Sequence, residues 1–395
     1  MWKMQAGMGD AVIAPLYLLL KARKVKFEFF HSVEAIRLDA TGARVEQIDM
    51  VAQLGPNVDV SGYEPLIEVP DETAPGAPSL ECWPGEPLWA KLPGSDQAAS
   101  SGHDYEQEPN PDGVAPNTLQ CGADKDFEAV VLAIPVSALP AICADVSAKV
   151  PRFEDMLKHS ETIATQAFQL WLTLPLKGLG WVHSENSVAG CYVEPIDTWA
   201  DMTHLLHKER WSKADGVSGV AYFCGVLEDV SNETPAAANA RVKDNVERFL
   251  VDHVGPLWPR AVRAGKIYWP TLADPGRETV GPARLDAQYW RANVSATERY
   301  VLTPADSVRY RLAAGGSGIT NLALAGDWTR NGIDGGCVEA AMTSGLQAAA
   351  HLVGGGGGEL TGASPTWLSG ETTGRVSMPP PLRPDGTGGA DPVEE

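Results

Sequence analysis

The sequence has little positive charge. Its 395 residues include 31 Lys and Arg against 51 Asp and Glu, which gives a formal net charge of -20. A surface of this sign repels the phosphates of nucleic acids and anionic lipids, so we expect no nucleic-acid partner. Hydrophobic residues make up 44% of the chain, which is enough to build a sizeable core and predicts a globular protein.

Cysteine pairs and long hydrophobic runs are also lacking. The six cysteines include no CxxC pair, which argues against a zinc site and a thioredoxin-type motif. We expect reduced thiols and a cytoplasmic localisation. The apolar run at residues 11–20 is too short to span a bilayer, and Lys21 follows it where a cleavage site should be. The run therefore predicts an amphipathic helix and no stable membrane insertion.

The first half of the chain mixes ordered and irregular patterns. Apolar spacing predicts a helix over residues 10–23 and a strand over 26–30, whose β-rich run leads to Val33 and Ile36. Residues 55–117 are rich in Pro, Gly, Asp, Glu and Ser without a sustained period, which predicts an irregular insertion. An apolar run over residues 129–134 is typical of a buried parallel strand.

The second half indicates a separate α+β lobe followed by a polar tail. Residues 152–317 contain two expected strands, 167–174 and 219–226, and a helix over 235–254. The tail, 354–395, begins with five glycines and continues as a Pro-, Gly- and Thr-rich acidic stretch. It has too little apolar surface to bury, so we expect it to be disordered.

One stretch, NLALAGDWTRNGIDGGCVEAAMTSGLQAAAHL from Asn321, carries most of the chemical information. A short apolar strand leads into Gly326-Asp327, then into a turn at Gly335-Gly336 and a helix. Mostly small residues are expected on the buried helix face, namely Val338, Ala341, Met342, Gly345, Ala348, Ala349 and Leu352. A face of this kind packs closely on a sheet or on a flat ligand.

Two interpretations of this stretch are open. In the first, the glycines serve only a tightly packed strand-turn-helix unit. In the second, the unpaired N–H groups of the first helical turn, at Cys337, Val338 and Glu339, stabilise partial negative charge on a ligand. Asp327, at the carboxyl end of the strand, would then meet a hydroxyl-bearing ligand such as a ribityl chain, because ligands bind at that end of open α/β sheets.

The segment LALAGDWTRNGIDGGCVEAAMTSGLQAA resembles the C-terminal flavin-binding motif of the flavin-containing amine oxidoreductases and phytoene desaturases. Two further segments are similar to the same superfamily, MQAGMGDAVIAPLYLLLKARKVKFEFFHSVEAI and FEAVVLAIP. The resemblance implies an FAD site. Val33 would contact the adenosine part through its backbone, Ile134-Pro135 would flank the dinucleotide, and Gly326 and Asp327 would contact the ribityl or pyrophosphate region.

The resemblance also implies the place of the reactive ring. Gly336, Cys337 and Val338 would lie under the isoalloxazine, with their N–H groups facing the N1 and C2 oxygen where charge accumulates on reduction. Many amine oxidases have a tyrosine at the position of Cys337. The thiol therefore favours a desaturase-like branch, and we expect it to be buried and packed rather than attached to flavin.

The sequence departs from the superfamily at its start. Members begin with a strand and a GxGxxG loop that holds the FAD pyrophosphate. The closest imitation, Gly7-Met-Gly9, has no preceding strand and has Val12 where the third glycine belongs. We therefore expect the FAD-binding domain to lack its first βαβ unit.

The predicted fold class is α/β plus α+β, with a partial Rossmann-like FAD-binding domain, truncated at the N-terminus, and a substrate-binding lobe. The domain boundaries are expected to be as follows: the FAD-binding domain at 1–50, 119–151 and 318–353, the insertion at 51–118, the lobe at 152–317 and the tail at 354–395.

The resemblance implies an FAD-dependent oxidoreductase. It would transfer hydride from a C–H or amine-bearing carbon of a small organic or isoprenoid substrate to flavin N5, while the lobe excludes water. The alternative is a non-catalytic fragment that cannot retain FAD, because the pyrophosphate loop is missing. No residue stands out as a general base.

Other candidate residues have ordinary explanations beside functional ones. His204 and His207 are three apart on an expected helix, but no third ligand is evident, so we expect a polar helix face and no metal. Arg291 and Arg309 either bind an acidic group or form surface ion pairs. Four aromatic residues either line an apolar substrate site or belong to the core, namely Trp269, Tyr289, Trp290 and Tyr300.

Overall fold

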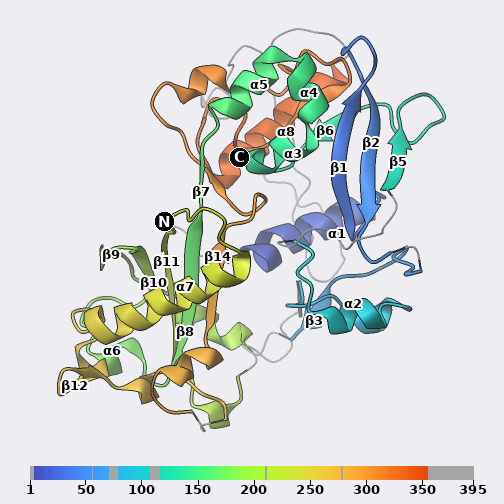
Figure 1. Ribbon diagram of the computed structural model, residues 1–395. Coiled ribbons are helices and arrows are strands. Elements are labelled where there is room, and N and C mark those ends of the chain that lie inside the picture. Colours follow the sequence, from blue (N-terminus) through green and yellow to red (C-terminus); the bar gives the residue numbers. More distant parts are fainter. Residues whose placement is uncertain are drawn as a thin grey trace, which may run out of the picture.

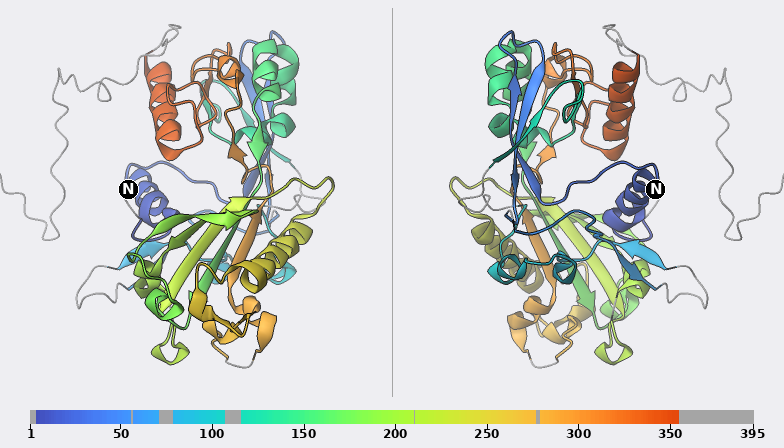
Figure 2. Two further views of the ribbon diagram at one scale, coloured as in Figure 1. Left: turned by 90° about the vertical axis from the view of Figure 1, so that its left-hand side faces the viewer. Right: turned by 90° about the vertical axis from the view of Figure 1, so that its right-hand side faces the viewer.

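The computed structural model describes residues 4–55, 57–70, 79–106, 116–209, 211–276 and 279–354 (Figure 1). The fold is mixed α/β with several separate sheets. An upper domain and a lower lobe lie at opposite ends of the molecule, and helix α1 (Ala14–Ala22) lies between them (Figures 1 and 2). Among the described residues, no helix has the length and apolar character needed to cross a membrane.

The upper domain combines two small sheets with short helices. Its strands are β1 (His31–Leu38), β2 (Val45–Ala52), β5 (Pro116–Gln120), β6 (Val130–Leu132) and β16 (Leu322–Leu324). Its helices are η3 (Val136–Ala138), α3 (Leu139–Ile142), α4 (Ala144–Lys149), α5 (Pro151–Lys158), η10 (Ser307–Tyr310) and α8 (Val338–Val353). The first sheet has the antiparallel order β1-β2-β5, while β6 and β16 form a separate parallel pair.

Asn321 joins these two sheets. Its side-chain oxygen accepts a hydrogen bond from the Val45 N–H at 2.7 Å, and its side-chain nitrogen donates to the Val45 carbonyl at 3.0 Å. Asn321 precedes β16 and Val45 begins β2, so one buried amide fixes the end of β16 against the β1–β2 hairpin. Buried polar groups need such partners, because an unpaired one costs free energy.

The lower lobe is built on one antiparallel sheet of order β14-β8-β11-β10-β9. Its strands are β8 (Thr165–Leu172), β9 (Val188–Val193), β10 (Ile196–Asp201), β11 (Gly219–Val226) and β14 (Tyr289–Asn293). Alternate side chains of β8 are buried, because successive residues of a strand point to opposite faces. Helix α7 (Pro235–Arg248) and η6 (Phe249–His253) cover this sheet (Figure 1).

Small elements complete the lobe and its connections to the upper domain. In the lobe they are α6 (Leu176–Leu179), η4 (Thr203–Lys208), η5 (Lys213–Asp215), η7 (Pro259–Ala261), β12 (Val262–Arg263), β13 (Lys266–Ile267), η8 (Trp269–Thr271) and η9 (Gly281–Ala287). The two parts are connected by β7 (Thr162–Ile163) and β15 (Tyr300–Val301), which pair with each other.

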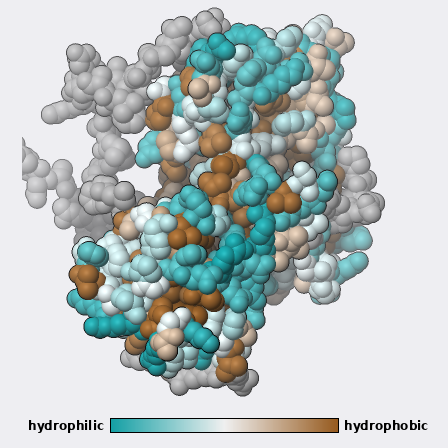
Figure 3. Space-filling model, turned by 60° about the vertical axis from the view of Figure 1, so that its left-hand side comes forward, coloured by the Kyte–Doolittle hydropathy of each residue, from teal (hydrophilic) through white to brown (hydrophobic). Residues whose placement is uncertain are grey.

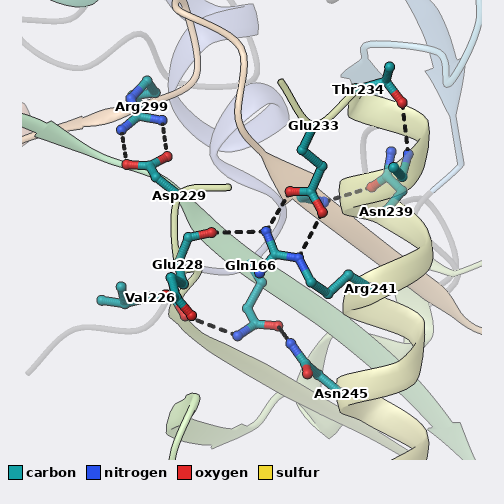
Figure 4. A network of polar contacts seen from close by, with 12 residues as sticks. Gln166, Val226, Glu228, Asp229, Glu233, Thr234, Asn239, Arg241, Asn245 and Arg299 are labelled. Atoms are coloured by element: carbon teal, nitrogen blue, oxygen red, sulfur yellow. Dashed lines mark hydrogen bonds and ion pairs between the residues drawn. The ribbon is translucent and has the colours of Figure 1, made fainter. Parts of the chain in front are cut away.

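Polar side chains fix α7 on the sheet (Figure 4). The Thr234 hydroxyl caps the helix by accepting the Ala237 N–H at 3.2 Å. Within the packed layer, the Asn245 amide donates to the Gln166 side chain at 3.0 Å, and Gln166 donates to the Val226 carbonyl at 3.0 Å. Each donor in this buried chain therefore has an acceptor, which is the condition for placing polar groups in a core.

The expected elements of the lobe are confirmed. The strands predicted at 167–174 and 219–226 correspond to β8 and β11, and the helix predicted at 235–254 corresponds to α7 with η6. Alternating and 3.6-residue patterns are reliable here because each element has one face on a large common core.

The N-terminal prediction is partly wrong. The helix over 10–23 is confirmed as η1 (Gly9–Ile13) with α1, but residues 26–30 form no strand, since the first strand is β1. Phe27 and Phe29 lie instead against Tyr17 of α1, with ring centroids 4.7 and 6.1 Å away. Aromatic packing on the helix thus replaces the pairing that the β-rich composition suggested.

The run at 129–134 is likewise shorter and less buried than predicted. Only residues 130–132 form β6, and Val131 is 47% exposed. The insertion, predicted to be irregular, contains β3 (Ile67–Val69), β4 (Leu80–Cys82), η2 (Trp89–Lys91) and α2 (Asp96–Ser101), and β5 begins within its range. Of the tail predicted to be disordered, residues 355–395 lie outside the described part of the chain.

Apolar side chains of α1 are exposed. Leu16, Leu19 and Leu20 are more than one-third accessible, whereas Ala14 and Tyr17 are buried. Figure 3 shows hydrophobic residues in the middle of one face, between the upper and lower parts of the molecule. All six cysteines are unpaired with one another, and their reduced state stays a prediction.

Candidate functional site

A pocket of about 440 Å³ lies where the upper domain meets the β14–β15 segment. We call it the motif pocket, because residues of two of the predicted motifs line it. Its lining residues are Ala133, Pro135, Val136, Glu298, Arg299, Tyr300, Val301, Gly326, Asp327, Trp328 and Ala341. The loops after β6 and β16 and the first turns of α8 thus face the same space, as expected of the carboxyl ends of parallel strands.

The backbone at Gly326 requires glycine. Its φ angle is +146°, and an added Cβ would lie 2.3 Å from Nε1 of the buried Trp328. The Gly326 N–H donates to the Ser344 hydroxyl at 3.1 Å, and its carbonyl accepts the Thr329 hydroxyl at 2.9 Å. This glycine therefore lets the chain leave β16 sharply and pass close to α8.

Asp327 presents a half-buried carboxyl group to the motif pocket. Burial raises the pKa of this carboxyl, while Arg311 opposes the shift. The Arg311 side chain is only 4% exposed, and burial lowers its pKa in turn. Both pKa shifts favour the neutral form of the side chain. The free-energy cost of burying the two charges therefore exceeds their mutual attraction.

Arg311 holds the turn by its hydrogen bonds. Its guanidinium donates to the Asp327 carbonyl at 2.8 Å, to the Leu302 carbonyl at 3.1 Å and to the Thr303 hydroxyl at 2.9 Å. No sequence pattern had pointed to Arg311 as a site residue. One sequence signal was nevertheless available. Arg311 directly precedes the apolar and glycine-rich run 312–316, and a cation next to a buried stretch needs hydrogen-bond partners.

Gly336 brings the second half of the motif against the first. An added Cβ would lie 3.0 Å from the Val301 carbonyl oxygen and 3.7 Å from the Asp327 carboxylate Oδ2. Cys337 is the N-cap of α8, and no side chain caps the helix there. The first N–H groups of a 16-residue helix are therefore left for a ligand or solvent beside Asp327.

A polar network fixes the turn between β16 and α8. The Asn331 side-chain oxygen accepts the N–H groups of Ile333 and Asp334 at 3.0 and 3.1 Å. The Asp334 carboxylate accepts the Asn331 N–H at 2.9 Å, and Gln347 of α8 donates to the Asn331 carbonyl at 3.2 Å. The turn is thus held before any ligand arrives.

The prediction of the buried face of α8 is partly wrong, although Ala348 is buried as expected. The buried residues of the helix are Ala340, Thr343, Ser344 and Ala348, whereas Val338 is 46% and Met342 59% exposed. The helix is rotated relative to the predicted orientation. The cause is the Ser344 hydroxyl, which accepts hydrogen bonds from the Gly326 N–H and from the Thr329 hydroxyl, the latter at 2.7 Å. Hydrogen bonding to the turn outweighs the apolar pattern, and the larger apolar side chains remain accessible.

The remaining predicted site residues are spread over the upper domain. Ile134 and Val33 do not line the motif pocket. Both are partly buried and pack against the upper core, where Val33 of β1 pairs with Met50 of β2. Pro135, Gly326 and Asp327 line the motif pocket, while Gly336, Cys337 and Val338 stand at the adjoining start of α8.

The lobe contributes its own residues to the motif pocket through the β14–β15 segment. Arg299 pairs with Asp229 at 2.7 Å, which fixes it beside the lobe (Figure 4). Of the four aromatic candidates, only Tyr300 lines the pocket, and it is 60% exposed. The other three have surface or core positions: Tyr289 is exposed, and Trp269 and Trp290 pack against the lobe core.

The other sequence candidates have structural partners. Arg291 forms an ion pair with Glu298, and the Arg309 guanidinium lies over the Tyr310 ring at 4.9 Å. His204 Nε2 is 2.9 Å from the Met4 carbonyl oxygen. Within the described ranges, no group of three or more His, Cys, Asp or Glu side chains is placed to hold a metal ion.

The motif pocket fits one half of FAD better than the other. Its volume lies in the usual range for ligand pockets, about 300–1,000 Å³, and it offers an uncapped helix start and a carboxyl group beside small residues. These are suitable contacts for a flat ring and a hydroxylated chain. No GxGxxG loop occurs in the sequence, so the residues present do not provide the usual cradle for the diphosphate.

No family model matches this chain. No curated protein matches it either. Among solved structures, one similar chain is an oxidoreductase from Methanosarcina mazei, with 12% sequence identity and a TM-score of 0.43. The match covers 86% of this chain and 53% of that chain, so the protein spans about half of that neighbour's length. A likeness of this degree identifies neither the fold family nor the function.

Proposed function

We propose that the protein binds the flavin end of FAD in the motif pocket and serves as an FAD-dependent oxidoreductase of the amine oxidase and phytoene desaturase type. The supporting observation is that Pro135 and Gly326-Asp327, which belong to separate sequence motifs, line one pocket beside the start of α8. Bound FAD supplies the capacity to accept a hydride from a C–H or amine-bearing carbon. The substrate class remains a small organic or isoprenoid molecule.

The residues of the chain have distinct roles in this proposal. Asp327 accepts a hydrogen bond from a hydroxyl of the ribityl chain, and Arg311 keeps its backbone in place. The N–H groups at the start of α8 favour partial negative charge on the ring. Glu298, Arg299 and Tyr300 close the pocket from the lobe and reduce its access to water.

The alternative function is that of a non-catalytic fragment that does not retain FAD. The missing GxGxxG loop favours it, because the diphosphate carries most of the charge of the cofactor and has no glycine-rich cradle here. The two proposals differ in a measurable quantity, the free energy with which the folded chain binds flavin.

Thermal melting with FAD, FMN and riboflavin tests the proposal. A ligand that binds only the folded protein stabilises it by about 2.7 kcal/mol at a hundredfold excess over Kd. We expect all three flavins to raise the melting temperature, and riboflavin to retain most of the effect because the residues present fit the ring and ribityl chain. Indifference of the melting temperature to all three would leave only the non-catalytic fragment.

Matched variants locate the binding site. Asp327→Asn removes the acceptor charge in the motif pocket and should abolish most of the flavin-induced shift. Asp306→Asn makes the same chemical change at an exposed residue outside the pocket and should keep the shift. Equal shifts in the two variants would show that flavin binds elsewhere.

A further inference from the structure

A second, larger pocket lies between the insertion, the open end of the β1–β2 hairpin and the lobe. Its volume is about 590 Å³, and we call it the aromatic pocket. Phe30, Trp89 and Tyr105 line it together with the carboxylates of Glu86, Asp104 and Glu106. In Figure 1 the insertion elements β3 and α2 lie beside the lobe, on the side opposite to α6. None of these six residues belongs to the motif pocket.

Three aromatic rings form one wall of this pocket. The ring centroids of Phe30 and Trp89 are 6.5 Å apart, those of Phe30 and Tyr105 are 6.2 Å apart, and those of Trp89 and Tyr105 are 6.3 Å apart. The three rings therefore stand at the corners of a nearly equilateral triangle. Phe30 and Trp89 are stacked, with 28° between their planes, whereas Tyr105 stands at 80° to Phe30 and at 54° to Trp89.

Hydrogen bonds hold the segment that carries Tyr105. The Gln53 side chain donates to the Tyr105 carbonyl at 3.0 Å, and the Thr297 hydroxyl bonds to the Glu106 carboxylate. These contacts tie the insertion to the end of β2 on one side and to the β14–β15 loop on the other. The pocket is therefore assembled in advance, which lowers the entropic cost of binding.

The pocket is strongly acidic. Arg291 is the single Lys or Arg among its described lining residues, and Glu298 already pairs with it. The surrounding insertion, residues 51–118, contains twelve Asp and Glu and only one Lys or Arg, Lys91. More than half of the formal net charge of -20 thus comes from this segment. Such a field raises the local concentration of cations and repels anions.

We propose that the aromatic pocket binds a small organic cation with an alkylated ammonium group. Aromatic faces attract a weakly hydrated cation through the ring quadrupole, and carboxylates at the rim add Coulomb attraction. A bare metal ion fits poorly, because it needs several oxygen ligands at close range and the wall consists of aromatic carbon. An anionic ligand would meet the carboxylates of Glu86, Asp104 and Glu106.

An ion pair joins the lining of the aromatic pocket to that of the motif pocket. Arg291 lines the aromatic pocket and its partner Glu298 lines the motif pocket. The proposed cation site does not depend on flavin binding, because no residue is shared between the two linings. It can therefore be tested on the full chain without added cofactor, and its failure would leave the proposed oxidoreductase function untouched.

The test compares choline with 3,3-dimethylbutan-1-ol, which has the same shape but carries carbon in place of the charged nitrogen. Titration calorimetry of the full chain should show saturable binding of choline that is at least about fivefold tighter than binding of the neutral alcohol. Added salt should weaken choline binding, because it screens the carboxylates. Equal affinity for the two compounds, or no saturable choline binding, would overturn the proposal.

Two variants and two controls assign the site. Trp89→Ala and Glu106→Gln should each weaken choline binding, the former by about fivefold. Trp211→Ala and Glu68→Gln make the same changes outside the pocket and should leave the affinity unchanged. Glu106 is exposed, so its variant keeps the fold and the result stays interpretable if Trp89→Ala proves unstable. Undiminished choline binding in Glu106→Gln and in a folded Trp89→Ala would refute the assignment.

Discussion

Replacing Gly326 by alanine should lower the free energy of unfolding and make the protein much easier to unfold. A residue other than glycine in this backbone region costs about 1–3 kcal/mol. The new Cβ would in addition lie 2.3 Å from Nε1 and 2.6 Å from Cδ1 of Trp328, which is 2% exposed and cannot turn away. Overpacking of this kind adds about 1–3 kcal/mol, so Gly326→Ala should lose about 2–6 kcal/mol of unfolding free energy.

A second glycine of the same motif provides the control. Gly345 lies inside α8, and an added Cβ there would meet no atom within 4 Å. Alanine is the better helix former by about 0.5–1 kcal/mol, so Gly345→Ala should stabilise the protein. Each variant thus adds one methyl group. Gly326→Ala should lower the free energy of unfolding, whereas Gly345→Ala should raise it.

Urea unfolding followed by circular dichroism measures both effects. We expect the two transition midpoints to move in opposite directions from that of the wild type, with unchanged slopes. If Gly326→Ala unfolds at the same urea concentration as the wild type, the close approach of the turn to Trp328 is not a constraint. Gly326 would then not be needed to shape the motif pocket.

Three further predictions concern polar side chains. Burial raises the pKa of Asp327 in the folded protein above the ordinary value of 3.8. The free energy of unfolding therefore falls as the pH rises from 3.8 through the raised pKa, because the buried carboxyl must then ionise. Asp327→Asn should therefore melt at a higher temperature than the wild type at about pH 7 and lose this advantage near about pH 3. Asn321→Ala leaves both backbone groups of Val45 without a partner and should cost at least about 2 kcal/mol in urea unfolding. Arg311→Leu removes the donors to the Asp327 and Leu302 carbonyls, at a similar cost of about 2 kcal/mol or more, and should raise the pKa of Asp327 further in an NMR titration.

Local patterns predicted the lobe better than the upper domain. Strands β8 and β11 and helix α7 each have a face on one large core, so their periodicity reflects their packing. Residues 26–30 have the composition of a strand but find aromatic partners on α1, and no sequence window shows that choice. Long-range pairing, such as the order β14-β8-β11-β10-β9, depends on contacts that composition does not encode.

The site shows the same division between local and distant information. The strained turn at Gly326 and the position of Asp327 beside the start of α8 agree with the sequence pattern, while their contacts with FAD stay a prediction. The roles of Arg311 and Ser344 could not be predicted from spacing, since both depend on how the turn folds back on α8. Those hydrogen bonds bury Ser344 where Val338 and Met342 had been expected on the buried face, while Ala348 is buried as predicted.

Parallel pairing of β6 with β16 joins two segments that the ribosome makes at very different times. The whole lobe, from β8 to β14, is synthesised between them. Its sheet can close while translation continues, because its strands need no partner from the upper domain. The upper domain must wait for β16 and α8 to emerge, and β6 lacks its described partner strand during that interval. We therefore expect nascent chains to depend on chaperones for their upper half and to fold their lobe unaided.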